Sequence, residues 1–196
     1  MNVPAATWGH RARAHMRLLL GGEARIIEWR VVRPGEDGAA WGEVTPDAEP
    51  LREHAIHLAE DLARTKPGLV VFVGPAPTRW YDLMDVVEIF RISGAAVWLV
   101  TGPSVFNPQS APIIAYHFTR IRVALSAAPG EDDLRRVHLL TGLWPRGPVD
   151  ALVPARADDA VRSGLRAAGV AGVIEGSGVP RAGRIVHPDL RVEARG

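Results

Sequence analysis

The chain has 196 residues, 47% of them hydrophobic, which is enough to bury one substantial core or two small ones. Its 23 basic and 22 acidic residues nearly cancel and form no long run of one sign, so a nucleic-acid or anionic-membrane surface is not indicated. The absence of cysteine excludes disulfides, thiol nucleophiles and thiolate metal sites. We expect a globular protein, and the composition indicates no cofactor.

Residues 1–24 contain basic side chains and a short run, Met16 to Leu20, that is apolar apart from Arg17 and is ended by Gly21 and Gly22. A signal peptide needs roughly 7 to 15 apolar residues and a membrane span about 20, so this run predicts neither. We expect a soluble chain with no membrane span. Its expected location is cytoplasmic by default, and periplasmic if a membrane anchor is missing from this chain.

Apolar strands alternate with amphipathic helices through the first half of the chain. The run LVVFV at 69–73 is apolar on both faces, as in a strand covered by helices. Ala55, Leu58 and Leu62 share one face of the helix before it. In chain order, the expected elements are a strand over 26–32, a helix through Arg64, a strand over 69–73, a helix from Thr78 through Ile92 and a strand over 95–100.

The stretch from Thr101 to Pro112 is rich in Gly, Pro, Ser and Asn and predicts a boundary. After it the pattern of elements repeats, and the tail predicts one short edge strand, at 184–187 or at 190–192. The expected elements here are a strand over 121–125, a helix over 131–143, a strand over 149–153, a helix over 158–168 and a strand over 172–175.

These patterns predict the α/β fold class, with two successive βαβαβ-type units whose mixed sheet or sheets are flanked by helices. The expected divisions are an N-terminal segment (1–24), a first unit (25–102), a linker (103–118) and a second unit (119–196). Both units end in a helix, a glycine corner and a strand. The second unit is therefore either a diverged repeat of the first or an independent example of a common pattern.

Residues 25–102 resemble the soluble periplasmic domain of the ExbD/TolR family, the ion-driven partners of TonB- and Tol-type energy transduction. Both show an apolar strand, a short polar loop, a Tyr that opens a helix, a small-residue corner with Gly and a strand that ends in LV. The positions that carry the resemblance are Tyr81, Leu83, Met84, Val86, Ser93, Gly94, Leu99 and Val100.

The resemblance implies a fold and a habit of pairing soluble domains and docking partner proteins. Family members also carry an N-terminal transmembrane helix with an aspartate in the ion pathway. This chain contains no such helix, so none of its residues inherits that role. The resemblance therefore implies docking rather than motor activity.

The sequence EHAIHLAE places His54 and His57 one helical turn apart, with Glu53 and Glu60 beside them. Imidazoles at this spacing share a helix face and can bind Zn or a similar ion when a third ligand comes from elsewhere. The sequence identifies no such ligand. A solvated face of an amphipathic helix explains the same residues.

Loops that follow strands are the second place where chemistry is expected, because open parallel sheets bind ligands at the carboxyl ends of their strands. Backbone N–H groups and hydroxyls there can bind a phosphate, but no loop matches a P-loop or a dinucleotide fingerprint, and plain turns explain them equally. The candidate ligand-binding residues are Gly74, Thr78, Thr101, Gly102, Ser104, Gly176, Ser177 and Gly178.

No complete catalytic motif occurs in the sequence: it has no G-x-S-x-G elbow and no recognisable arrangement of Ser, His and Asp. Acidic pairs at 132–133 and 158–159 fall where helices are expected to begin. Negative charge at a helix N-terminus interacts favourably with the helix dipole, which explains these pairs. No catalytic residue is assigned. The sequence leaves enzymatic activity open and leans against it.

Trp29 and Trp98 lie in expected strands and are assigned to the core. Other aromatic residues lie in or beside loops, where an exposed indole is a common interface anchor, although covering the end of a core explains each of them equally. The candidate interface residues are Trp41, Trp80, Tyr81 and Trp144.

Two functions follow from these observations. The first is a non-enzymatic interaction module that docks a protein partner or forms a homo-oligomer through sheet edges and loop tryptophans. The second is a small-molecule or nucleotide-binding α/β protein, with enzymatic activity left open, that uses the loops at the carboxyl ends of its strands.

Overall fold

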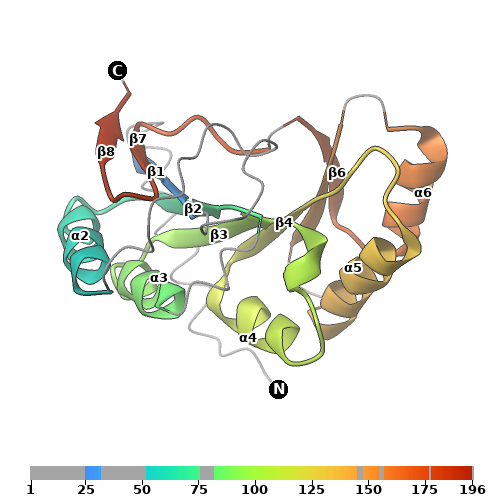
Figure 1. Cartoon of the computed structure of the whole chain (residues 1–196), viewed down its shortest axis with the longest axis horizontal. Helices are drawn as coiled ribbons and strands as arrows, with labels where there is room; N and C mark the ends of the chain where they lie inside the picture. The colour runs from blue at the N-terminus through green and yellow to red at the C-terminus, as the bar shows by residue number, and fades with distance from the viewer. Residues whose placement is uncertain are drawn as a thin grey trace. The chain divides into compact units, whose positions relative to one another are not determined.

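A computed structural model describes residues 25–31, 52–75, 82–144, 148–154, 157–176 and 178–195. Helices alternate with mostly parallel strands, which confirms the predicted α/β fold class (Figure 1). The chain divides into two compact units: unit 1 contains residues 1–98 and 180–196, and unit 2 contains residues 99–179. The division falls inside strand β3 (Ala96–Thr101).

Unit 1 is built on strand β1, which lies parallel to both of its neighbours, β2 and β7. The order of these strands is β2-β1-β7-β8, and β8 runs antiparallel to β7. The bounds are β1 (Ile26–Arg30), α2 (Arg52–Arg64), β2 (Leu69–Val73), α3 (Leu83–Ile92), β7 (Arg184–Val186) and β8 (Val192–Ala194).

Three aromatic rings form the centre of the unit 1 core. Trp29 of β1 stands opposite Phe72 of β2 in the strand register, and their ring centroids lie 5.8 Å apart. Phe90 of α3 meets both rings edge-on, at 6.0 Å and 6.3 Å. All three side chains are almost fully buried, so this stacking fixes α3 on the face of the sheet that carries Trp29.

Unit 2 contains a parallel sheet with the strand order β6-β5-β4. Side chains of β4 alternate, since Ile121 and Val123 are fully buried whereas Arg120 and Arg122 are partly exposed on the other face. The bounds are η4 (Pro103–Val105), α4 (Ser110–His117), β4 (Arg120–Ala124), α5 (Glu131–Leu143), β5 (Val149–Val153), α6 (Asp159–Ala167) and β6 (Gly172–Glu175).

The same corner ends α3 of unit 1 and α6 of unit 2. Gly94 follows α3 with φ 82°, and Gly169 follows α6 with φ 86°, a backbone conformation that glycine adopts without strain. Ala95 N–H donates to Phe90 O over 3.1 Å, and Val170 N–H donates to Leu165 O over 3.4 Å. Both are Schellman-type helix ends. This match fits a diverged repeat and equally fits two independent examples of a common corner.

The predicted linker over 103–118 is wrong, because this stretch contains η4 and α4 and belongs to unit 2. Pro103 opens the short helix η4. Asn107 Oδ1 accepts hydrogen bonds from the N–H groups of Gln109 and Ser110 over 2.9 Å and 2.8 Å. The residue types that indicated a loop are here used to start helices.

The C-terminal tail also differs from the sequence-based expectation, which placed it in the second unit with one edge strand. The first alternative contains β7, and β8 begins at Val192, the last residue of the second alternative. The two strands form a hairpin in unit 1. The reason is the parallel pairing of β7 with β1, in which Ile27 lies opposite Arg184. β7 has only three residues and pairs with a strand from the opposite end of the sequence, so the hydrophobic pattern gives little indication of this pairing.

Candidate functional site

Those candidate ligand-binding residues that the structure describes lie at the ends of strands, as predicted. Gly74 is buried directly after β2, and Thr101 is fully buried as the last residue of β3. Gly102 takes the position before η4, and Ser104 is exposed within it. Thr78 and Ser177 lie outside the described residues.

An arginine of unit 2 holds the loop that follows β3. Arg136 of α5 donates from Nη1 to Ser104 O over 3.3 Å and to Phe106 O over 3.0 Å. Ser110 Oγ donates to Val105 O over 2.5 Å. The carbonyl groups around Ser104 are thus used within the fold, and the loop has a structural role as the start of α4.

Backbone conformation explains both glycines of the loop that follows β6, and packing is a second reason for Gly178 alone. Gly176 has φ 84° and Gly178 has φ 58°, and both conformations favour glycine. A Cβ atom at Gly178 would overlap Cδ2 of Leu152, whereas nothing lies within 4 Å of a Cβ atom at Gly176. The backbone at Gly178 therefore lies directly on the side chain of Leu152.

An ion pair closes the same loop against the start of α6. Arg162 donates from Nη2 to Glu175 Oε1 over 2.6 Å and from Nε to Ala157 O over 3.2 Å. This guanidinium joins the end of β6 to the residues that precede α6. Arg162 thus links the residues after β5 to the end of β6.

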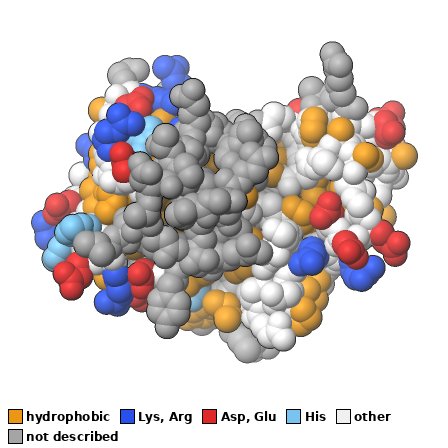
Figure 2. Space-filling model, in the orientation of Figure 1, with side chains coloured by type: hydrophobic (Ala, Val, Ile, Leu, Met, Phe, Trp, Pro, Cys, Tyr) orange, Lys and Arg blue, Asp and Glu red, His pale blue; other side chains and the backbone are white. Residues whose placement is uncertain are grey.

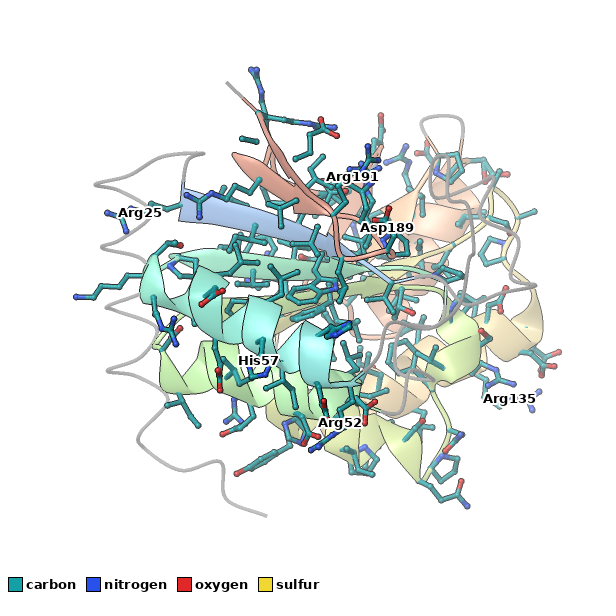
Figure 3. The ribbon with its side chains drawn as sticks, turned by 60° about the vertical axis from the view of Figure 1, so that its left-hand side comes forward. Arg25, Arg52, His57, Arg135, Asp189 and Arg191 are labelled. Atoms are coloured by element: carbon teal, nitrogen blue, oxygen red, sulfur yellow. The ribbon has the colours of Figure 1, made fainter. Side chains whose placement is uncertain are left out.

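The two candidate metal ligands, His54 and His57, are exposed on α2, and Figure 3 shows His57 on this helix. His57 Nδ1 is 3.7 Å from Glu60 Oε2, and the His57 side chain is 76% exposed. Among the described residues, no group of three or more His, Asp or Glu side chains is placed to hold a metal ion. His54 and His57 therefore have the geometry of a solvated helix face.

Trp144 follows α5 and is only 8% exposed, so it covers the end of the core and is not an exposed anchor. Trp29 is buried as predicted, whereas Trp98 is half-buried. Trp41, Trp80 and Tyr81 lie outside the described residues. Trp144 is therefore not available as an anchor of the predicted interface.

A buried carboxylate that the sequence analysis missed lies in β5. Asp150 is 3% exposed, and its Oδ2 atom is 2.9 Å from Arg120 Nη1 and 3.4 Å from Arg122 Nε. Burial lowers the pKa of Arg122, and the neighbouring carboxylate opposes this shift. The signal in the sequence was the single acidic residue in the apolar run VDALV.

Unit 1 contains a second carboxylate of this kind. Glu28 of β1 is 8% exposed, and its Oε1 atom accepts a hydrogen bond from Arg30 Nε over 2.7 Å. The two residues are two positions apart on one strand and so share a face of the sheet. Each unit therefore neutralises a buried acid with arginine side chains from its own strands.

A few large apolar side chains remain exposed in the described residues. Two of them, Ile113 and Tyr116, lie one turn apart on α4. Over α4, at the lower edge of the view in Figure 2, the surface is mainly orange and white. The complete set is Ile92, Ile113, Tyr116, Leu143 and Val192.

Strand β8 ends the strand order of unit 1, and all three of its residues are exposed. Charged side chains occupy this edge, since Arg191 and Arg195 flank Glu193. Glu193 Oε2 lies 3.1 Å from His187 Nε2, and this hydrogen bond is the main cause of a lowered pKa for Glu193. Charged residues of this kind protect a sheet edge against unspecific pairing.

No protein-family model matches the chain, and comparison with curated proteins finds no match either. The resemblance of residues 25–102 to the ExbD/TolR family therefore stays a prediction. In the part of the chain that the structure describes, no helix combines the length and the apolar character that crossing a membrane requires.

Proposed function

We propose that this chain is a non-enzymatic interaction module, similar to the soluble domain of ExbD/TolR proteins, that docks a protein partner or a second copy of itself. The order of β2, α3 and β3 supports the proposal, because the resemblance implies a strand, a helix and a strand in this order. The corner at Ser93 and Gly94 adds support, since it turns the chain from α3 into β3 with a glycine at φ 82°.

The observation that carries the proposal is the exposed apolar surface on α4. Ile113 is 53% exposed and Tyr116 is 59% exposed. Exposed apolar side chains that lie next to each other favour a protein–protein contact, whereas isolated ones do not. Aromatic side chains such as Tyr116 are also enriched in interfaces.

The test combines light scattering with affinity capture. Purified protein is examined by size-exclusion chromatography with light scattering over a wide range of concentration, and tagged protein is used to capture partners from cells. We expect self-association or one reproducible partner. A strict monomer that captures no partner would contradict the proposal.

A thermal-shift screen with nucleotides, sugar phosphates and divalent cations tests the competing function as a ligand-binding protein. A ligand at 100 times its dissociation constant stabilises the folded state by about 2.7 kcal/mol. We expect no stabilisation in this screen. A clear shift with any of these compounds would favour the ligand-binding function instead.

A further inference from the structure

We propose that a basic patch on unit 1, formed by Arg25, Lys66 and Arg184, binds an acidic segment of a partner protein. The inference rests on the proposed function, because it names a surface of the interaction module and the chemistry of its partner. It commits to a polypeptide that presents two or more carboxylates close together. Nothing in it depends on α4, which belongs to unit 2.

Three separate segments of the chain bring the patch together. Arg25 directly precedes β1, Lys66 lies in the connection between α2 and β2, and Arg184 opens β7. A backbone hydrogen bond of 2.9 Å from Gly68 N–H to Arg25 O joins the first two segments, and the parallel pairing of β1 with β7 joins the third. The three cations thus gather where β1, β2 and β7 begin, and Figure 3 shows Arg25 at the start of β1.

Both arginines of the patch donate to Thr65, the residue that follows α2. Arg25 Nη1 donates to Thr65 O over 2.8 Å and to Lys66 O over 3.1 Å. Arg184 Nη1 donates to Thr65 Oγ1 over 3.2 Å. The two guanidinium groups are therefore held next to each other at the carboxyl end of α2. The negative end of a helix dipole amounts to about half a charge, which is less than the positive charge gathered here.

The cations of the patch have no acidic partner within the described residues: neither arginine nor Lys66 forms an ion pair with Asp or Glu there. Other arginines of unit 1 do form such pairs. A guanidinium nitrogen lies 2.6 or 2.7 Å from a carboxylate oxygen at Arg30, Arg52, Arg64 and Arg91. The patch therefore keeps a local excess of positive charge, which attracts an anionic partner.

The hydrogen bonds to Thr65 leave one edge of each guanidinium available. A guanidinium has several N–H donors, and within the described residues Arg25 and Arg184 use only Nη1. The Nε and Nη2 groups of both side chains can therefore donate side by side to the two oxygens of a carboxylate, an arrangement that adds strength and directionality. Because the Nη1 atoms are already fixed, less side-chain entropy is lost when a carboxylate binds.

The size and exposure of the patch favour a polypeptide over other anions. Nucleic acids bind by neutralising many phosphates, whereas the patch offers three cations on a chain with a net charge of +1. Small anions usually bind in a concave pocket that buries most of the ligand, whereas Arg25 and Lys66 are exposed. Neighbouring Asp or Glu side chains of a protein supply carboxylates in pairs, which matches the two guanidinium edges.

The first experiment measures the binding of a fluorescent octaglutamate peptide to the full chain by anisotropy. Lys66→Glu reverses one charge of the patch, and Arg166→Glu makes the same change of charge at an exposed position of α6. We expect Lys66→Glu to weaken binding about tenfold, because a like charge then faces the peptide, and Arg166→Glu to bind as wild type does. Arg184→Gln should weaken binding as well.

Circular dichroism checks that all three variants remain folded. Equal binding by wild type and Lys66→Glu would overturn the inference, and so would an equal loss in Lys66→Glu and Arg166→Glu. A wild-type chain that does not bind the peptide would overturn it too. Raising the ionic strength from about 0.1 M to about 1 M shortens the screening length from about 10 Å to about 3 Å, so we expect binding to be lost at high salt.

Competition separates the classes of anion. Pyrophosphate, a short oligothymidine and unlabelled octaglutamate are each added to the complex of the full chain with the labelled peptide. We expect octaglutamate to compete best at equal charge. Stronger competition by pyrophosphate would indicate a small-anion site, and stronger competition by the oligonucleotide would indicate a nucleic-acid site. Either result would overturn the assignment to an acidic polypeptide.

Affinity capture separates this inference from the proposed function. Tagged wild type and tagged Lys66→Glu are used to capture partners from cells. A partner that wild type binds, that octaglutamate displaces and that Lys66→Glu does not bind would support both. A partner that the two chains capture equally would overturn the role of the patch but leave the interaction module standing. If wild type captures no partner, the proposed function depends on self-association, and the peptide titration still decides the inference.

Discussion

The Oδ2 atom of Asp150 accepts a hydrogen bond from Nη1 of Arg120 over 2.9 Å, and the Asp150 side chain is almost inaccessible to solvent. Arg122 shares the same oxygen. Because removal of one partner leaves buried charge uncompensated, such clusters are costly to break even where the intact pair contributes little.

We therefore predict that Asp150→Asn lowers the free energy of unfolding by about 2 to 3 kcal/mol, less than for a fully buried pair because Arg120 retains access to water. Urea denaturation measures this value. The matched control is Asp85→Asn, which breaks an exposed pair with Arg52 at 2.7 Å and is expected to cost clearly less than Asp150→Asn, because water screens exposed ion pairs. Equal losses in the two variants would show that burial of the Asp150 cluster has no energetic effect.

The two glycines after β6 separate backbone strain from steric overlap. Gly176→Ala and Gly178→Ala both place a side chain at positive φ, which costs about 1 to 2 kcal/mol. Only Gly178→Ala also forces the new Cβ atom against Leu152, which adds about 1 to 3 kcal/mol. Thermal or urea unfolding should rank the variants in this order.

A double variant tests the cause of that difference. Removing the obstructing side chain in Leu152→Ala should reduce the extra cost of Gly178→Ala, since the overlap no longer exists. If the cost of Gly178→Ala is the same in both backgrounds, then Leu152 is not its source.

The hydrogen bond between His187 and Glu193 predicts a measurable pH effect in the β7–β8 hairpin. Its formation lowers the pKa of Glu193, so its stabilising effect is present above the ordinary pKa of a glutamate. That effect is lost as the pH falls through the lowered pKa of the folded state. We expect His187→Ala to raise the pKa of Glu193 in a carboxyl-detected NMR titration.

Arg191→Ala is the control for that titration. Arg191 contributes the smallest of the named effects on Glu193, so its removal should raise the pKa of Glu193 less than His187→Ala does. The reverse ranking would contradict a hydrogen bond as the main cause.

Lys66 lies two residues after the end of α2 and has a left-handed conformation with φ 54°, the conformation that Gly94 adopts after α3. We predict that Lys66→Gly stabilises the protein by up to about 1 kcal/mol and that Gly94→Ala destabilises it by about 1 kcal/mol. Thermal unfolding checks both signs. Lys66→Ala is the control and should leave stability nearly unchanged, because alanine keeps the strain.

Hydrophobic pattern sufficed to predict most elements of the fold. The bounds of β2, α5, β5 and β6 agree with the expected ranges, because each is an uninterrupted apolar run or a helix between clear turn residues. The first strand ends at Arg30 and not at residue 32. The pattern could not show which distant strands pair, so the return of β7 to β1 was missed.

The candidate site was less accessible to sequence reasoning. Trp144 lies beside a loop in the sequence but is buried in the structure, since burial depends on what packs over a side chain. Ile113 and Tyr116 fall in a stretch dominated by turn-forming residues, which hid the helix that aligns them. The ion pairs of Asp150 join β4 to β5 and require knowledge of the strand register.

Unit 2 is one continuous stretch of chain inserted into unit 1, whose last strands, β7 and β8, follow it. During synthesis, every residue of unit 2 is therefore made before β7, so β1 and β7 can pair only after unit 2 is complete. Until then, β1 has one unpaired side, and its closing contacts span most of the chain, which slows folding. We expect unit 2 to mature first and unit 1 to be the part of the protein most dependent on chaperones while the chain is being made.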